Sequence, residues 1–413
     1  MTYDNSRLFA HSLDEQDFLA DYRDSFHYPK NKNNKELIYF GGNSLGLQPK
    51  TVSDFLNREL LVWSGKGVLG QEERWIEYHE RLAKSTAKLV GAFTPEVVVM
   101  NALTVNIHLL LISFYQPNQS KYKIMIEKDA FPSDHYAVHS QIRLHGYEPD
   151  LALIELSPRE DEKILRHEDI ISEIENHGDE LALIYLGGVN YYTGQSFDLE
   201  KITKAGKKKG CMVGFNLAHS VGNVLMNLHD WGVDFSAWCT YKYLCAGPGS
   251  PSGVFIHDRH HEWDGPRLLG WWGHNKDTRF EMPSTFEPIN TSEGWQISNA
   301  PIMGMAPLLA SMEIFNKAGM NSIRKKGKNL SSYMEYLINQ FVPSVNIITP
   351  EARGCQLSLS VPKGKEVYDY LLKNDVVCDW RNPDVIRVAP HPLFNRYIEI
   401  YDFVKILKKA IVQ

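Results

Sequence analysis

One lysine in this sequence has the surroundings that a nucleophilic amine needs. Lys242 lies in the segment Trp238-Cys-Thr-Tyr-Lys-Tyr243, which continues an apolar run typical of a buried strand. Burial lowers the pKa of a lysine, and a neutral amine can form a Schiff base with an aldehyde. A lysine that extends along the protein to keep its amine in water explains this segment equally well. Lys242 is therefore the first candidate for covalent chemistry.

Five other residues of suitable type follow predicted strands. Thr104 is placed to begin a helix, whose free N–H groups would attract a phosphate. Phe131 could stack on a flat ring, Asp134 could accept a hydrogen bond, and Asn216 and His219 could face one ligand. Taken singly, a helix cap, a turn and hydrogen-bonded polar residues explain them better. Their shared position matters, because open α/β sheets bind ligands beyond the carboxyl ends of their strands.

Two further patterns suggest sites that we reject. Gly65-Lys-Gly-Val-Leu-Gly70 matches the dinucleotide fingerprint GxGxxG, but residues 55–63 before it have helical and not strand periodicity. His257, Asp258, His260 and His261 form a cluster with no further ligands at metal spacing. We interpret that cluster as a surface turn and predict no metal.

Apolar runs between residues 95 and 257 predict the strands that position these residues. The runs are Val97–Asn101, Lys123–Glu127, Leu181–Leu186, Cys211–Asn216, Phe235–Thr240 and Gly253–His257. Amphipathic stretches such as Leu199–Lys209 separate them. Nearly continuous apolar strands are buried on both faces, so we predict a mostly parallel sheet covered by helices.

The C-terminal third has a different pattern. Cys355–Val361 alternates apolar and polar residues, which predicts a sheet with one face in water. A small α/β domain is completed by a helix over Glu366–Asn374 and by extended runs at Val376–Asp379 and Ile386–Ala389. A long helix over Pro307–Lys317, which ends at Gly319, is predicted to join it to the larger domain. We predict a large ligand-binding domain over residues 50–300 and a small domain formed by residues 1–49 and 301–413.

Composition excludes several classes of protein. A net charge of −6 argues against a nucleic-acid-binding protein, which would need a basic face. No apolar stretch is long enough to span a membrane, and the N-terminus lacks the pattern of a secretion signal. The five cysteines include no CxxC pair, so we expect reduced thiols and a cytoplasmic protein.

Together, many short segments resemble kynureninase, a fold-type-I pyridoxal-phosphate enzyme. The resemblance runs from Tyr39-Phe-Gly-Gly-Asn-Ser-Leu-Gly-Leu-Gln-Pro49 to Arg387-Val-Ala-Pro390 and so covers most of the chain. It includes residues 100–106, 131–136, 192–194, 229–234, 241–243, 270–274, 297–299 and 381–383. Each segment is short, but their number and order make the resemblance specific.

The resemblance implies a cofactor, pyridoxal 5′-phosphate, held as a Schiff base on Lys242. Leu103 and Thr104 would bind its phosphate, and Tyr241 would add a hydroxyl. The residues expected to hold the pyridine ring are Phe131, Asp134, Asn216 and His219. The implied fold is a large domain with a mostly parallel sheet and a smaller C-terminal α/β domain.

The implied reaction is hydrolysis of L-kynurenine to anthranilate and L-alanine, with 3-hydroxykynurenine as a possible substrate. Lys242 would move protons at the substrate α-carbon, and Tyr241 is a candidate second acid or base. Arg387 would bind the substrate carboxylate through its planar fork. Trp271 and Asn299 would reach the cofactor and substrate, partly from the second subunit of a homodimer.

Two departures from the family pattern leave alternatives open. Asn216 replaces an aspartate that pairs with the pyridine nitrogen in the family. The cofactor nitrogen would then be largely neutral and catalysis slower. On this hypothesis Asn216→Asp should raise kcat. The early loop Gly70-Gln-Glu-Glu-Arg-Trp75 lacks a histidine that would face the substrate ring. The alternatives are a related enzyme that acts on another β-substituted amino acid, and a homologue that is weakly active or non-catalytic. Cysteine desulfuration is disfavoured because no cysteine lies between Cys245 and Cys355.

Overall fold

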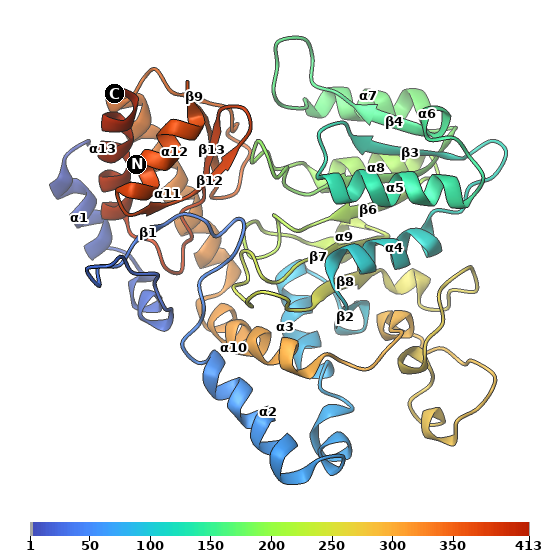
Figure 1. The fold of residues 1–413 in the computed structure, drawn as a ribbon. Coiled ribbons are helices and arrows are strands. Elements are labelled where there is room, and N and C mark those ends of the chain that lie inside the picture. The colour runs from blue at the N-terminus through green and yellow to red at the C-terminus, as the bar shows by residue number, and fades with distance from the viewer. Residues whose placement is uncertain (1–2, 413) are drawn as a thin grey trace.

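A seven-stranded sheet forms the centre of the larger part of the molecule (Figure 1). The computed structural model describes residues 3–412. The strand order is β2-β8-β7-β6-β5-β3-β4, and every neighbouring pair is parallel except the two that involve β8. The strands are β2 (Val97–Met100), β3 (Lys123–Glu127), β4 (Leu153–Leu156), β5 (Leu181–Gly187), β6 (Met212–Asn216), β7 (Phe235–Trp238) and β8 (Ser252–Ile256). The six predicted strands and the mostly parallel sheet are confirmed; β4 was not predicted.

Helices cover both faces of this sheet, as its apolar strands require. Val98 and Met100 of β2 point into one apolar core with α4 and α5, whereas Val97 and Val99 point into the other with α3, α7 and α8. This alternation follows from the two-residue period of a strand. The helices are α2 (Val52–Lys66), α3 (Glu80–Val90), α4 (Leu103–Phe114), α5 (Pro132–Leu144), α6 (Pro149–Ala152), α7 (His167–His177), α8 (Leu199–Lys208) and α9 (Leu228–Trp231).

A second, smaller sheet lies in the C-terminal part. Its order is β12-β13-β10-β9, and all its pairs are antiparallel. The strands are β9 (Asn346–Ile347), β10 (Leu357–Ser360), β12 (Asp379–Arg381) and β13 (Val385–Val388), and β1 (Ile38–Tyr39) pairs separately with β11 (Val376–Val377). The helices of this part are α1 (Arg7–Glu15), α11 (Met320–Phe341), α12 (Gly364–Lys373) and α13 (Tyr397–Val412). The predicted strand, helix and extended runs are confirmed, but the expected face in water is wrong, because Ser358 of β10 is fully buried and every residue of β13 is buried.

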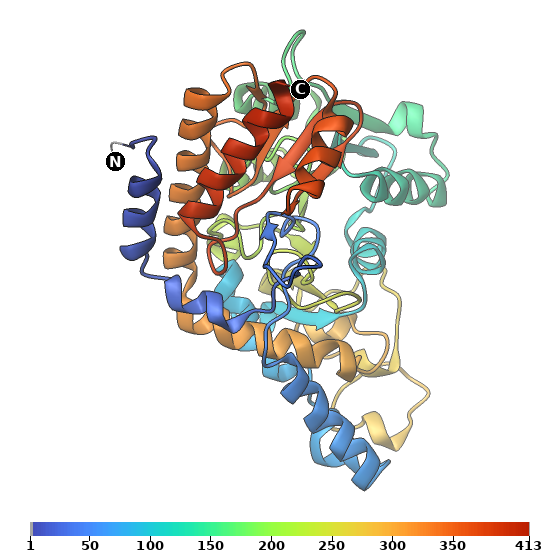
Figure 2. The ribbon, with the colours of Figure 1, turned by 60° about the vertical axis from the view of Figure 1, so that its left-hand side comes forward.

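Long helices connect the two parts. α10 (Ile302–Ala318) ends at Gly319 as predicted and packs into the core of the large sheet, while α11 packs into the core of the small one. α1 lies beside α11 and α13 in both views, so the N-terminal helix joins the small sheet (Figures 1 and 2). α2 projects from the body of the molecule, and residues 55–70 contain no strand, which agrees with our rejection of the dinucleotide fingerprint. None of the helices described within residues 3–412 is both long and apolar enough to cross a membrane.

Candidate active site

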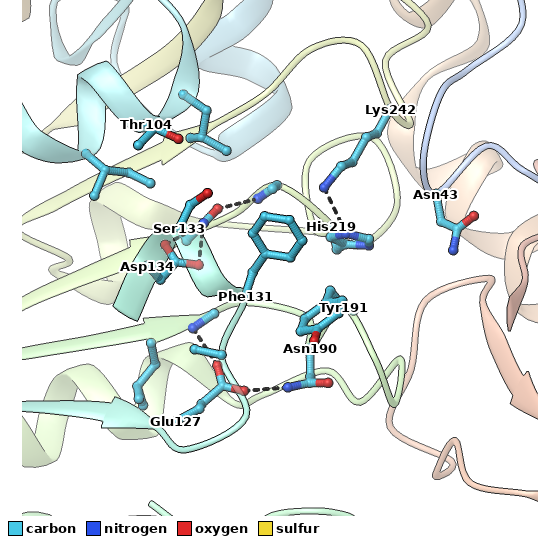
Figure 3. Close-up of a pocket in the computed structure, with 18 of the residues that line it drawn as sticks. Asn43, Thr104, Glu127, Phe131, Ser133, Asp134, Asn190, Tyr191, His219 and Lys242 are labelled. Carbon is cyan, nitrogen blue, oxygen red and sulfur yellow. Dashed lines mark hydrogen bonds between the residues drawn. The ribbon is translucent and has the colours of Figure 1, made fainter. Parts of the chain in front are cut away.

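A cavity of about 340 Å³ opens at the carboxyl ends of the parallel strands (Figure 3). This is the edge at which an open α/β sheet binds ligands. Nine of the predicted site residues line it: Leu103, Thr104, Phe131, Asp134, Asn216, His219, Tyr241, Lys242 and Arg387. They come from the segments after β2, β3, β6 and β7 and from β13, so residues far apart in the sequence meet at one place.

The amine of Lys242 points to a histidine within this cavity. Its Nζ lies 2.9 Å from Nε2 of His219 (Figure 3). Burial lowers the pKa of both groups, and the nearby Lys242 lowers that of His219 further. A neutral imidazole accepts a hydrogen bond from the amine through Nε2, which leaves Nδ1 to carry the ring proton, and Nδ1 has no partner among the described residues. The arrangement favours an uncharged amine, the form that attacks a carbonyl.

The loop of Lys242 is held by a segment from the N-terminal part of the chain. Gly46 N–H donates to the carbonyl of Tyr241 at 2.8 Å. A Cβ on Gly46 would lie 2.4 Å from the carbonyl oxygen of Lys242 and 2.6 Å from Sγ of Cys245. Only glycine permits this close approach, which explains how residues 41–47 position the reactive loop.

Asp134 is the centre of a buried hydrogen-bond network. Its carboxylate accepts from the Tyr185 hydroxyl at 3.1 Å and from Nδ2 of Asn216 at 2.9 and 3.1 Å. Asn216 Oδ1 accepts from the N–H of Ala218 at 3.0 Å, so the network fixes which end of this amide faces Asp134. Burial raises the pKa of Asp134, although the hydrogen bonds from Asn216 and Tyr185 oppose the shift.

The start of α4 offers free backbone donors to the cavity. The helix begins at Leu103, and its N-cap is Ala102, whose side chain cannot cap. The expectation that Thr104 caps this helix is therefore wrong. Asn106, which donates to the carbonyl of Met100 at 2.8 Å, steadies the preceding turn instead. Exposed Thr104 and the uncapped N–H groups of the first turn remain available to an anion.

Two arginines from the small sheet close another side of the cavity. Arg387 is fully buried, pairs with Asp379, and donates to the carbonyl of Tyr191 at 2.6 Å. Arg381 shares Asp379 at 3.1 Å, and Nε of both guanidinium groups is buried without a partner among the described residues. Burial lowers the pKa of Arg387, an effect that Asp379 opposes. A carboxylate in the cavity would satisfy these donors.

The sequence analysis did not single out several polar residues of the cavity, among them Glu127, Asn43 and Asn190. Glu127 ends β3 and accepts from Gly187 N–H and from Nδ2 of Asn190, each at 2.7 Å, and burial raises its pKa. Asn43 is fully buried, donates to Gln356 at 3.1 Å, and leaves its Oδ1 without a partner among the described residues. The position of Glu127 at a strand end was the available signal, whereas nothing in the sequence marked Asn43 or Asn190 individually.

Aromatic residues flank the lysine. The rings of Phe131 and Tyr241 each have their centre 6.0 Å from Nζ of Lys242. Phe131 is 42% exposed and meets Tyr191 edge to face at 5.2 Å, so one face of its ring is open to a ligand. Burial raises the pKa of Tyr241, which keeps its hydroxyl protonated at neutral pH and suited to donate a hydrogen bond.

Two predicted residues lie outside this cavity. Trp271 is 46% exposed and donates through Nε1 to the carbonyl of Arg279 at 3.1 Å, and Asn299 is exposed. The early loop over residues 70–75 is also remote from the cavity lining, and its Arg74 pairs with buried Glu59 at 2.7 Å. These segments therefore do not complete the site within one chain.

The cavity suits an aldehyde that carries a phosphate and a flat ring. It combines an amine of lowered pKa, an uncapped helix start, an open aromatic face and a buried carboxylate, each from a different segment. Among the described residues, Nδ1 of His219 and Nε of Arg381 and Arg387 are buried polar atoms without a partner, and all three residues line the cavity. The residues fit the pyridoxal phosphate that the sequence predicts.

Comparisons with known proteins show what this chain is similar to. A family described as the kynureninase C-terminal domain matches residues 323–407. Kynureninase of Flavobacterium johnsoniae is 50% identical and covers 100% of both chains, and kynureninase of Homo sapiens is 48% identical over 98% of this chain and 92% of its own. Among solved structures, a cysteine desulfurase from Thermococcus onnurineus superposes with a TM-score of 0.77 at 18% identity, covering 95% of this chain and 98% of its own. A C-DES mutant with glycine linked to its PLP cofactor superposes with a TM-score of 0.77 at 16% identity, over 90% of this chain and 96% of its own. The fold is that of fold-type-I pyridoxal-phosphate enzymes.

Proposed function

The chain belongs to the kynureninase family, and from this premise we propose that it hydrolyses L-kynurenine to anthranilate and L-alanine in tryptophan degradation. Water adds at the side-chain carbonyl and the Cβ–Cγ bond breaks. 3-Hydroxykynurenine would give 3-hydroxyanthranilate by the same steps, on a route toward NAD. The observation that carries the proposal is the amine of Lys242, held 2.9 Å from a buried histidine in a cavity that also contains unpartnered arginine nitrogens.

We propose pyridoxal 5′-phosphate as the cofactor. When bound, it supplies an aldehyde that condenses with amines and a ring that accepts the electrons released at an adjacent carbon. Leu103, Thr104 and the free N–H groups of α4 would hold its phosphate, with the Tyr241 hydroxyl beside them. Phe131 would cover its ring, and the residues lining the rest of the ring site would be Asp134, Asn216 and His219.

The side chains of this chain divide the remaining work. Arg387 would orient the substrate through its α-carboxylate, because its fork matches the two oxygens. Lys242, whose pKa is lowered by burial, would take the proton from the substrate α-carbon and return it. His219 would orient the lysine amine by accepting its hydrogen bond through Nε2, and the Tyr241 hydroxyl would donate to the substrate carbonyl as water attacks.

We also propose that the active enzyme is a homodimer in the cytoplasm. Trp271 is exposed beside other exposed apolar residues of its segment, namely Leu268, Leu269, Phe280 and Met282. Exposed apolar side chains gathered in one segment favour burial against a partner. Trp271 and Asn299 would then reach the cofactor and substrate of the neighbouring subunit. All five cysteines are free and buried, as a reducing compartment would leave them.

Borohydride trapping tests the cofactor and lysine together. Incubation with pyridoxal phosphate followed by reduction should label the peptide that contains Lys242, and Lys242→Ala should lose both the label and the near-ultraviolet band of the bound cofactor. Lys204→Ala, at an exposed helical position, is the matched control and should keep both. Release of anthranilate from kynurenine, followed by its fluorescence, then tests the reaction. A labelled protein that releases no anthranilate would retain the cofactor proposal and refute the substrate.

A further inference from the structure

Two histidines and two carboxylates converge at the edge of the large sheet opposite the active site. Glu96 directly precedes β2, His229 lies in α9, and His257 and Asp258 follow β8. One nitrogen or oxygen from each lies within 4.8 Å of the others. Because β8 is antiparallel to β7, its last residues lie at the amino ends of the parallel strands, whereas Lys242 lies beyond their carboxyl ends.

The distances within this cluster are those of potential ligand atoms. Oε1 of Glu96 lies 2.8 Å from Nδ1 of His229 and 3.5 Å from Nδ1 of His257. Nδ1 of His257 lies 2.7 Å from Oδ1 of Asp258. The two imidazole rings are stacked with their centres 4.7 Å apart, and both turn Nδ1 toward Glu96.

The cluster also lacks a cation to balance its carboxylates. Glu96 is fully buried and accepts from the N–H groups of Phe93 at 2.7 Å and Asp258 at 2.9 Å. Within residues 3–412, no lysine or arginine forms an ion pair with Glu96 or Asp258; their ionic partners are the histidines alone. A buried carboxylate is costly without a compensating charge.

A second cluster in the chain provides a contrast. His79, Glu80 and Glu293 also bring their ligand atoms within 4.8 Å of one another. There the ammonium of Lys276 lies 2.7 Å from Glu80 and 2.9 Å from Glu293, so it already occupies the position of a cation. The cluster at Glu96 has the same kind of ligands without such an ammonium.

We propose that Glu96, His229, His257 and Asp258 bind a divalent transition-metal ion, with Zn²⁺ as the best match. Two imidazole nitrogens and two carboxylate oxygens form a ligand set that suits zinc, whereas Mg²⁺ and Ca²⁺ prefer oxygen alone. Zinc–ligand bonds of about 2.0–2.1 Å in a tetrahedron separate the ligand atoms by about 3.4 Å, which lies between the shortest contact of this cluster, 2.7 Å, and its 4.8 Å limit. Each imidazole would carry its proton on Nε2 and bind through Nδ1, without net proton release from the rings.

The ion would tie together three segments that are distant in sequence. Residue 96 lies ahead of β2, residue 229 in α9, and residues 257–258 at the end of β8. A metal held by all of them resists separation of these strands, since binding to the folded chain alone stabilises it. The function is therefore stabilisation at the far edge of the sheet, and the rate of the reaction at Lys242 does not depend on it. The proposal revises our interpretation of residues 257–261 as a surface turn without a metal. His260 of this turn is not a proposed ligand, because it pairs with Asp234 at 2.8 Å.

Calorimetric titration with ZnCl₂ tests the site. The holoenzyme, stripped with EDTA and dialysed, should bind one Zn²⁺ per chain and melt at a higher temperature with Zn²⁺ present. His257→Gln and Asp258→Asn should each weaken zinc binding by at least about tenfold and remove most of the melting shift. MgCl₂ should give no comparable binding.

His79→Gln is the matched control, because it alters the cluster that already contains Lys276. It should bind zinc as the unchanged chain does. The proposal would be overturned if the chain showed no saturable zinc binding. It would also be overturned if His257→Gln and Asp258→Asn stayed folded by circular dichroism and bound zinc as the unchanged chain does. Loss of zinc binding should leave anthranilate release unchanged, so this test does not depend on the proposed reaction.

Discussion

Replacing Asn216 by aspartate would place a second carboxylate beside buried Asp134. The amide nitrogen of Asn216 lies 2.9 and 3.1 Å from the two oxygens of Asp134. Two unit charges about 3 Å apart repel by about 5 kcal/mol at an effective dielectric constant of about 20, which corresponds to about four pKa units. The pair would therefore hold one proton at neutral pH and share it through a hydrogen bond.

The sign of the pH dependence follows from this shared proton. The folded Asn216→Asp chain keeps a proton that the unfolded chain releases above about pH 4, so its stability falls as the pH rises. We expect the difference in unfolding free energy from the unchanged chain to grow by about 1.4 kcal/mol per pH unit, or about 3 kcal/mol between pH 6 and 8. Urea denaturation of the cofactor-free chain at pH 6, 7 and 8 measures it.

A swap of the two side chains is the matched control. The double variant Asn216→Asp/Asp134→Asn again has one carboxylate and one amide at these positions, so its pH dependence should return to that of the unchanged chain. Equal pH slopes for Asn216→Asp, the swapped variant and the unchanged chain would refute the reasoning, because the added carboxylate would then not interact with Asp134.

Three further predictions concern substrate binding and stability. Arg387→Lys should raise KM for kynurenine about ten- to a hundredfold, since the planar guanidinium that binds two carboxylate oxygens is lost. An unchanged KM in steady-state kinetics would exclude Arg387 from carboxylate binding. Burial lowers the pKa of His391 to about 4, so the free energy of unfolding should fall by about 2 kcal/mol as the pH falls from 7 to 5. In urea titrations His391→Gln should reduce this loss. A loss as steep as that of the unchanged chain would assign it to other groups. Lys326 pairs with Asp17 at 2.6 Å, and both side chains are buried. Lys326→Met should therefore lower the free energy of unfolding by about 3–5 kcal/mol, and adding Asp17→Leu should restore part of it. Additive losses in the double variant would contradict a coupled pair.

Family membership disfavours the alternatives that the sequence departures raised. Asn216 and the missing histidine in residues 70–75 left room for another substrate or for a non-catalytic protein. Identity of 48–50% over nearly whole chains favours kynurenine hydrolysis over both. The structure adds that Asn216 has a definite partner, because its amide donates to Asp134. The effect of this substitution on catalysis stays a prediction.

The sequence by itself determined six of the seven strands of the large sheet and singled out the lysine. A run of buried residues such as Leu181–Gly187 specifies a strand locally, and the segment around Lys242 carries its own signal of aromatic and apolar neighbours. Residues just after such runs, among them Asp134 and His219, could be assigned to one edge of the sheet because parallel strands share their carboxyl ends.

Only the tertiary structure decided which polar groups meet. The contacts of Glu127 with Asn190 and of Glu96 with His229 and His257 join segments from different strands, and the contact of Arg387 with the Tyr191 carbonyl joins the small sheet to the large one. Their distances depend on strand order, register and the packing of the small sheet on the large one. Sequence periodicity reports which face of an element is buried, but it contains no information about which element lies opposite, so these partners follow only from the folded chain.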